Sequence, residues 1–242
     1  MKVALPLMLA AGLLSPAGLI AQVPLADYVP MKIIQTEPVV YPHAAKDLGI
    51  ATGEAQVAIQ IDDKGKLTDY LVTAYTYPAF AEAAVVALKR WEYRPAYLHG
   101  EGRSARADLT FTFESQGLVL VDLTVSSYVE QRNYQLHPGT YAFHVCTLRD
   151  LDRIPTPTQV VKPLYPREFA GKAVKVVVQF YIDKDGQVRL PAVDSETGAA
   201  HDALSAAAVQ AVTEWKFEPP VSKGRPVVVA VRQEFNFKAA TN

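Results

Sequence analysis

The sequence predicts an α+β protein made of two copies of one small domain, each a three-stranded antiparallel sheet with helices on one face. Three observations support this fold class: uncommon residues recur at a fixed offset, apolar residues alternate with polar ones in short runs, and one apolar stripe follows helical spacing. Half of the 242 residues are apolar, which is enough to bury a core in each copy.

The duplication is clearest at the two tryptophans, Trp91 and Trp215, which lie 124 residues apart. Other landmarks keep this offset: Tyr41-Pro42 and Tyr165-Pro166, Pro95 and Pro219, Phe111-Thr112-Phe113 and Phe235-Asn236-Phe237. Two turn sequences are offset by 121 instead, because loops absorb length changes: Asp62-Asp63-Lys64-Gly65 and Asp183-Lys184-Asp185-Gly186. We therefore predict a first domain at 28–114, a second at 154–238, and an intervening segment at 115–153.

Each copy is expected to run helix, hairpin, helix, strand. Alternation of apolar and polar residues predicts the first hairpin strand, and a glycine in the following turn supplies the positive φ that a hairpin needs. The first strands are expected at 54–62 and 174–182, the second strands at 66–73 and 187–193, and short helices after each Tyr-Pro at 43–48 and 167–170.

The longer helix of each copy is predicted from an apolar stripe at spacings of four, four and three. The stripe residues are Phe80, Ala84, Leu88 and Trp91 in the first copy, and Leu204, Ala208, Val212 and Trp215 in the second. Small alanines between the large side chains suit close packing on a sheet. Since each tryptophan continues its stripe, we expect it to pack in the core. A final alternating strand, at 109–113 and 227–237, closes each copy.

The first 22 residues have the character of a secretory signal peptide. Lys2 is the only charge, an apolar run follows to Ala21, and cleavage is expected after Ala21 or, as an alternative, after Ala17. An uncleaved membrane anchor is the other interpretation, because the run is roughly long enough to span a bilayer. The prolines in the run and the absence of a flanking basic cluster favour the signal peptide. Membrane contact is expected only if the segment is uncleaved.

Composition and motifs argue against several function classes. The formal net charge is −1, so no global field favours nucleic acid or an anionic membrane surface. The sequence contains no Gly-x-Ser-x-Gly, no phosphate-binding glycine loop and no His-Glu-x-x-His, and its five histidines do not repeat in register. We therefore expect a protein that is not an enzyme and needs no cofactor.

The intervening segment is expected to form extra strands that extend the first sheet or bridge the two halves. It contains His137, His144 and Cys146, and a His-x-Cys pattern could bind a soft metal such as copper or zinc. Because no second cluster accompanies these residues, no metal site is predicted. Cys146 is the only cysteine, so an intramolecular disulfide is impossible, and a buried, inert thiol is the expectation.

One run of the second copy resembles the TonB C-terminal domain. Its elements are Tyr165-Pro166, the alternating strand ending Ile182-Asp183, Asp185-Gly186, Asp194-Ser195, Ala207-Ala208, Trp215-Lys216-Phe217 with Pro219, Gly224-Arg225-Pro226-Val227, and Phe235-Asn236-Phe237. The first copy keeps Tyr41-Pro42, the Asp62–Gly65 turn, Trp91 with Pro95, and Phe111-Thr112-Phe113. It departs at Thr73-Ala74-Tyr75-Thr76 and at Gly102-Arg103-Ser104-Ala105. The two stretches cover about seven tenths of the chain.

The resemblance implies a periplasmic, energy-transducer type of module in the cell envelope. Such a domain adds a strand to a short peptide, the TonB box, of an outer-membrane receptor, and so serves receptor-dependent transport. This sequence lacks the Pro-rich spacer of the transducers, so we expect a relative that keeps the binding module in duplicate, with the TonB box or another envelope protein as its partner. The alternative is a structural envelope protein that uses the fold for dimerisation or cell-wall contact.

Strand addition requires a sheet edge with free backbone groups. We expect this edge in the last strand of each copy, with the phenylalanines facing the core, so that the site consists mostly of backbone. The candidate residues are Arg106, Leu109, Phe111 and Phe113 in the first copy, and Val227, Val229, Val231, Phe235 and Phe237 in the second. The alternative interpretation is that these edges pair with each other, between the copies or across a homodimer.

Overall fold

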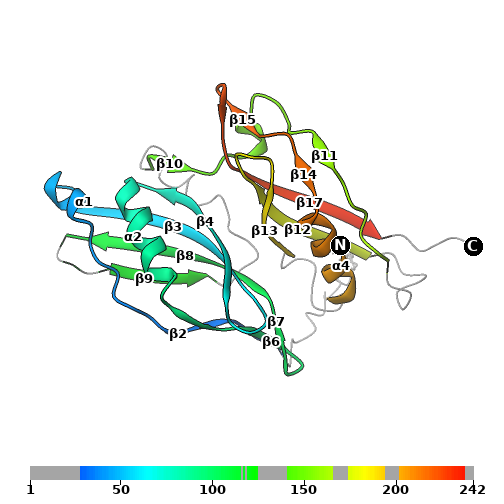
Figure 1. Ribbon diagram of the computed structural model, residues 1–242, viewed down its shortest axis with the longest axis horizontal. Helices are drawn as coiled ribbons and strands as arrows, with labels where there is room; N and C mark the ends of the chain where they lie inside the picture. The colour runs from blue at the N-terminus through cyan, green and yellow to red at the C-terminus, as the bar shows by residue number, and fades with distance from the viewer. Residues whose placement is uncertain are drawn as a thin grey trace, which may run out of the picture.

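The structure is a computed structural model that describes residues 28–115, 117, 119–124, 141–165, 174–193 and 202–237. Two units lie side by side, the first coloured blue to green and the second yellow to red in Figure 1. Both combine antiparallel strands with helices, which confirms the predicted α+β class. The expected signal peptide or anchor at 1–22 lies outside the described residues, as do the expected helix at 167–170 and His137.

The first unit is built on a five-stranded antiparallel sheet in the order β10-β4-β3-β8-β9. Its strands are β3 (Thr52–Ile61), β4 (Leu67–Tyr75), β8 (Ala105–Glu114), β9 (Val119–Thr124) and β10 (Phe143–His144). The three central strands are those that the alternation predicted. The two outer strands come from the intervening segment, so that segment does extend the first sheet.

The second unit keeps the three-stranded form, in the order β13-β12-β17. Its strands are β12 (Val174–Ile182), β13 (Val188–Val193) and β17 (Val229–Phe237), and β12 pairs with β17 without interruption along its whole length. The register of β12 on β17 matches that of β3 on β8 once the two repeat offsets are applied. The sheets of the two copies therefore share one arrangement of central strands.

Helices cover one face of each sheet. They are α1 (His43–Asp47), α2 (Pro78–Leu88) and α4 (Asp202–Thr213). The backbone N–H of the first residue of a helix has no acceptor within the helix. Pro78, which has no N–H, therefore suits the first position of α2. All four predicted stripe residues of the first copy are buried, and so are the first three of the second copy, whereas Trp215 is partly exposed.

Each tryptophan ring also fixes the segment that precedes the Tyr-Pro pair. The indole Nε1 of Trp91 donates to the carbonyl of Glu37 at 3.0 Å, and that of Trp215 donates to the carbonyl of Val161 at 2.7 Å. The two acceptors are separated by the same 124 residues as the tryptophans. These tryptophans therefore pack against the cores, as their stripes predicted, and anchor the segment that enters each copy.

Short strands before and after the longer helices complete both units, and the alternation in the sequence did not reveal them. Equivalent pairs are β2 (Lys32–Gln35) with β5 (Glu92–Arg94), and β11 (Pro157–Gln159) with β14 (Lys216–Phe217). The remaining short strands are β1 (Tyr28–Val29), β6 (Ala96–Leu98) and β7 (Glu101–Arg103) in one small sheet, and β15 (Val221–Ser222) with β16 (Arg225–Pro226) in another.

The glycine in each hairpin turn lies against the β5 or β14 segment. Gly65 has a φ of +87°, and a Cβ there would lie 2.3 Å from the carbonyl oxygen of Tyr93. Gly186 has a φ of +79°, and a Cβ there would lie 2.0 Å from the carbonyl oxygen of Phe217. Both the backbone conformation and the lack of space therefore require glycine at these two equivalent positions.

The two units also pack against each other. A buried apolar cluster joins them through residues of both sheets: Ala58, Val145, Tyr181, Leu190 and Val228, with Leu71 and Ala230 at its margin. Leu190 has a φ of +51°, which a branched residue rarely adopts, and its side chain is fully buried in this cluster. The packing between the two copies therefore holds Leu190 in this backbone conformation.

Polar contacts surround this apolar cluster. The guanidinium of Arg189 makes a two-pronged contact with the carboxylate of Asp69, with Nε at 2.8 Å from Oδ2. Arg106 donates to the hydroxyl of Tyr181 at 2.8 Å, and its guanidinium lies 4.7 Å from the centre of that ring. The neighbouring carboxylate of Asp108 is 3.6 Å from Arg106, too long for a hydrogen bond.

Candidate partner-binding edge

The first copy does not offer the open edge that the sequence led us to expect. Strand β8 pairs with β3 on one side and with β9 on the other, where Leu109 lies opposite Leu123 and Phe113 opposite Val119. The expectation that Arg106, Leu109, Phe111 and Phe113 lie on an edge strand is therefore wrong. The chain turns back at Gly117, which has a φ of +86°, and lays residues of the intervening segment along β8.

The side chain of Arg106 is not at an edge either. Only 4% of it is exposed, because it points into the contact between the two copies. Burial raises the pKa of its neighbour Asp108 to about 6, and the positive charge of Arg106 opposes this shift. Within the described part of the chain, neither carboxylate oxygen of Asp108 has a hydrogen-bond partner. This part of β8 therefore serves the interface between the copies.

The second copy places its last strand at the end of its sheet. Strand β17 pairs with β12 on its inner side, and Cys146 meets the beginning of its outer side. The N–H of Cys146 donates to the carbonyl of Val228 at 2.8 Å, and the N–H of Ala230 donates to the carbonyl of Cys146 at 2.9 Å. Beyond this bridge, no strand among the described ranges pairs with the outer side of β17.

Val227 does not belong to this edge. The expected strand began there, but β17 begins at Val229, and the N–H of Val227 donates to the carbonyl of Pro220 at 2.9 Å. This bond lies next to the short β15–β16 hairpin, which β-strand alternation did not reveal. Val229, Val231, Phe235 and Phe237 do lie on β17 and pack against the core of the second copy, as their alternation predicted.

The backbone groups of β17 alternate in direction. Because the N–H of Ala230 points outward to Cys146, the N–H groups of Glu234 and Asn236 point outward as well. The side-chain amide of Gln233 donates to the carbonyl of Glu234 at 2.8 Å and so occupies an acceptor on this side. An incoming strand would replace that local bond with a bond from its own backbone.

Exposed polar side chains frame the same stretch. The Lys175 ammonium lies 2.7 Å from the Glu234 carboxylate, and the amide of Asn236 donates to this carboxylate at 2.9 Å. The bond from Lys175, followed by that from Asn236, lowers the pKa of Glu234. The core-facing phenylalanines and this polar outer face leave mainly backbone groups for recognition, together with a negative side chain at Glu234.

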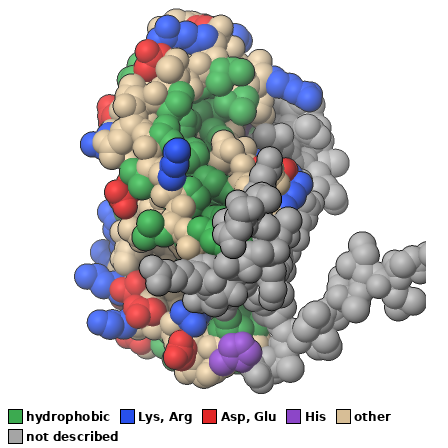
Figure 2. Space-filling model, turned by 90° about the vertical axis from the view of Figure 1, so that its right-hand side faces the viewer, with side chains coloured by type: hydrophobic (Ala, Val, Ile, Leu, Met, Phe, Trp, Pro, Cys, Tyr) green, Lys and Arg blue, Asp and Glu red, His purple; other side chains and the backbone are tan. Residues whose placement is uncertain are grey.

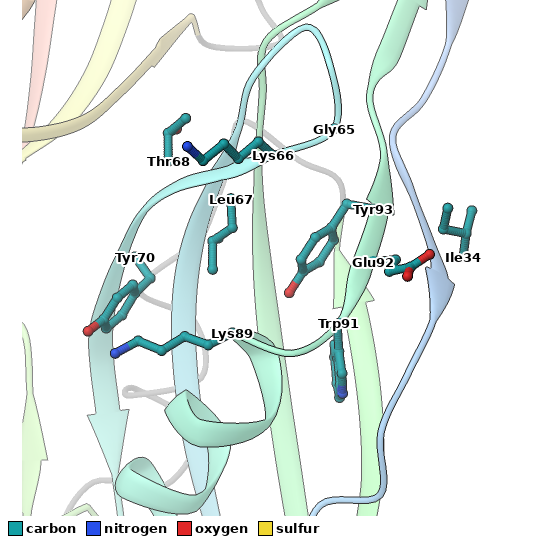
Figure 3. A pocket seen from close by; sticks show the side chains of 10 residues that line it. All are labelled: Ile34, Gly65, Lys66, Leu67, Thr68, Tyr70, Lys89, Trp91, Glu92 and Tyr93. Atoms are coloured by element: carbon teal, nitrogen blue, oxygen red, sulfur yellow. The ribbon is translucent and has the colours of Figure 1, made fainter.

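A second concave surface lies in the first copy, between the β3–β4 hairpin, the end of α2 and β2 (Figure 3). This open pocket has a volume of about 580 Å³. Its lining residues are Ile34, Gly65, Lys66, Leu67, Thr68, Tyr70, Lys89, Trp91, Glu92 and Tyr93. The Lys89 ammonium lies over the Tyr70 ring, 4.7 Å from its centre, and the Tyr93 hydroxyl donates to the carbonyl of Leu88 at 2.7 Å. The rings of Tyr70 and Tyr93 in this pocket thus contact other groups of the same chain.

Neither surface resembles a catalytic or metal centre. Among the residues whose positions are described, no group of three or more His, Cys, Asp or Glu side chains could hold a metal ion. His144 lies on β10, where its Nδ1 is 3.0 Å from the carbonyl of Val145, and Cys146 is half-buried at the bridge to β17. Burial raises the pKa of the Cys146 thiol, so the inert thiol is favoured over the thiolate.

The side of the second copy near β11 carries apolar side chains on its surface. Figure 2 shows hydrophobic groups gathered in a band, with charged side chains mostly at its margins. Large exposed apolar residues of the segment around β11 are Ile154, Val160 and Leu164, of which Leu164 is 84% exposed. The exposed Val40 of the first copy, at 69%, is the repeat equivalent of Leu164.

No described helix is both long and apolar enough to cross a bilayer.

Comparison with known proteins assigns the repeated unit. The family model described as Gram-negative bacterial TonB protein C-terminal matches residues 37–115 and again 161–239. The solution NMR structure of the Pseudomonas aeruginosa TonB C-terminal domain is 29% identical in sequence, covers 41% of this chain and 99% of its own, and has a TM-score of 0.33. No curated protein matches the chain. The two family matches confirm the tandem arrangement, and the protein belongs to the TonB C-terminal family, whose domains are non-enzymatic protein-interaction modules.

Proposed function

We propose that this protein is a periplasmic interaction module of TonB-dependent transport that binds a partner peptide by strand addition to the outer side of β17. The partner is a TonB-box segment of an outer-membrane receptor or an extended segment of another envelope protein. The observation that carries the proposal is the position of β17 at the end of its sheet, with outward N–H groups at Glu234 and Asn236.

The physical basis is that the backbone N–H and C=O groups at a sheet edge need hydrogen-bond partners. A row of outward N–H and C=O groups at a sheet edge binds an extended peptide through main-chain hydrogen bonds, and the side chains then select among peptides. The two phenylalanines of the strand point to the core and hold it in place, so the edge is presented on a rigid support. Export through the segment at 1–22 would deliver the module to the periplasm, where receptor peptides are accessible.

Amide hydrogen exchange of the full chain, with and without a TonB-box-like peptide, tests this function. We expect the outward amides of Glu234 and Asn236 to exchange quickly in the free protein and more slowly with peptide, while the inward amides of β17 stay protected throughout. Protection of the outward amides without peptide, rising with protein concentration, would instead indicate a homodimer through β17. Unchanged fast exchange at saturating peptide would contradict strand addition.

A further inference from the structure

We propose that β9 occupies the peptide-binding edge of the first copy from within the chain, so that the protein accepts one partner strand, at β17, in the orientation and side-chain pattern of β9. This inference rests on the proposed function and adds the number of sites and the chemistry of the peptide. It also accounts for the finding that, among the described residues, only one of the two copies has an open last strand.

The repeat offset places β9 on the surface that a partner would use. Residues 108–113 of β8 correspond to residues 232–237 of β17, and β9 pairs antiparallel with that part of β8 from Thr124 to Val119. The equivalent stretch of β17 begins just beyond the Cys146 bridge. The strand that fills the site in one copy thus marks where a strand fits on the other.

The phenylalanines of β8, which β9 covers, are more buried than their equivalents on β17. Phe111 and Phe113 are fully buried under the first sheet, where β9 continues it. Their equivalents are less covered: Phe235 is partly exposed and Phe237 retains 7% of its surface. An added strand on β17 would cover this remaining apolar surface, which favours association.

The residues of β9 define a side-chain pattern for the ligand. Val119, Val121 and Leu123 pack against the first core, whereas Leu120 is 51% exposed and Asp122 is exposed on the opposite face. Alternate residues of a strand point to opposite faces, so apolar residues at every second position are what this edge selects. The first two of these lie opposite Phe113 and Phe111.

Transfer of the pattern to β17 predicts two adjustments. Gln233 replaces Leu109, so the third core-facing residue of the ligand meets a polar neighbour. Glu234 replaces Thr110, which lies opposite Asp122, so an acidic residue at this ligand position would face a carboxylate. Like charges directly opposite each other disfavour pairing, so the preferred ligand carries a basic residue there. The partner is therefore an extended segment with two alternating apolar residues followed by a basic one.

The experiment uses the full chain and synthetic peptides that carry the β9 sequence, residues 119–124, with blocked ends. Calorimetric titration and hydrogen exchange should find one peptide bound per chain, with the outward amides of β17 protected. A peptide with the change Asp122→Lys should bind about threefold more tightly than the parent peptide, and the difference should shrink at high salt.

Variants of the protein test the occupancy of the first copy. The double variant Val121→Asp/Leu123→Asp places two charges on the face of β9 that packs against the first core. Because these charges favour water over the apolar core, β9 should detach from β8, and the peptide should then bind at two sites per chain. The matched control is Leu120→Asp, which places the new charge on the exposed face of the same strand and should keep a single site. Exchange protection of β3 and β4 verifies that the first copy of each variant is folded.

The possible outcomes separate this inference from the proposed function. If a TonB-box-like peptide protects β17 and the β9 peptides do not bind the wild-type chain, the inference is overturned and the proposed function stands. If the folded double variant still binds one peptide, the occupancy of the first copy is overturned. If neither kind of peptide binds, both proposals fail. Should the double variant unfold, the binding of the two β9 peptides to the wild-type chain decides the question.

Discussion

Strands β8 and β17 are the same element of the repeated domain, yet β8 lies inside a five-stranded sheet and β17 ends a three-stranded one. Both pair with their hairpin partner in the same register, and both direct two phenylalanines into a core. The difference arises outside the repeat, since β9 comes from the intervening segment. The same arrangement of central strands can therefore be closed or left open by a few residues of connecting chain.

The largest effect is expected from removal of the two tryptophans. Trp91 is 6% exposed in the closed copy, so Trp91→Ala should lower the free energy of unfolding by about 3–5 kcal/mol. Trp215 is partly exposed in the open copy, so Trp215→Ala should cost about 2 kcal/mol. Urea unfolding monitored by circular dichroism measures both values. Equal losses would show that the two cores are equally tight.

The next effect concerns the buried carboxyl group on β8. Burial raises the pKa of Asp108 to about 6, above the value of 3.8 expected for the unfolded chain. Between these two pH values the Asp108 carboxyl is protonated in the folded protein and ionised in the unfolded chain. The free energy of unfolding therefore falls as the pH rises through this window. Asp108→Asn should remove this dependence, which we expect to amount to about 2 kcal/mol between pH 4.5 and 7.5.

Urea unfolding of wild type and Asp108→Asn at pH 4.5 and 7.5 measures the change. Glu234→Gln on β17 is the matched control, because that carboxylate is solvent-exposed and paired with Lys175. The control should keep the pH dependence that originates at Asp108. If Asp108→Asn and wild type show the same slope in the window, then Asp108 keeps its ordinary pKa and the interface is open to water.

A smaller effect is expected at the ion pair that joins the copies. Arg189→Ala leaves the partly buried Asp69 without its two-pronged partner and should cost about 1–2 kcal/mol. Arg153→Ala serves as the control, because its pair with Glu218 is exposed on the arginine side at 68% and should contribute little. Thermal unfolding would contradict this prediction if both variants melt together with the wild type.

The smallest effect on stability is expected beside the open edge. Lys175→Ala should leave the free energy of unfolding nearly unchanged, because both members of its pair with Glu234 are exposed. The pKa of Glu234 should nevertheless rise, since the bond from Lys175 is the main cause of its lowered value. A titration monitored by NMR measures this pKa, and an unchanged value would assign the shift to Asn236 instead.

Much of each domain could be predicted from local patterns. The offset between Trp91 and Trp215, the alternation before the two glycine-containing turns and the helical stripe predicted the central strands, the hairpins and the longer helices. These features are local, because a strand or helix with one buried face repeats its apolar residues at a fixed period. The glycine at position 65 or 186 is likewise visible in sequence as part of a turn.

The candidate site was predicted only in part. Phe235 and Phe237 were placed correctly on a last strand that faces the core, but the edge proposed at Arg106–Phe113 is covered. The short alternation within 119–124 is a signal for β9, yet it does not specify which strand β9 joins. Val227 was misplaced because the apolar run after Pro226 continues across the boundary between a loop and a strand.

The sequence by itself determined three things: the tandem arrangement through the repeat offset, the resemblance to the family through its motifs, and the buried face of each strand through the period of its apolar residues. The tertiary structure decided which last strand is closed, how Cys146 bridges to β17, and how Arg189 and Leu190 join the copies. These are pairings between residues far apart in the chain. Their free energy depends on packing and desolvation after both copies have folded, which no local pattern records.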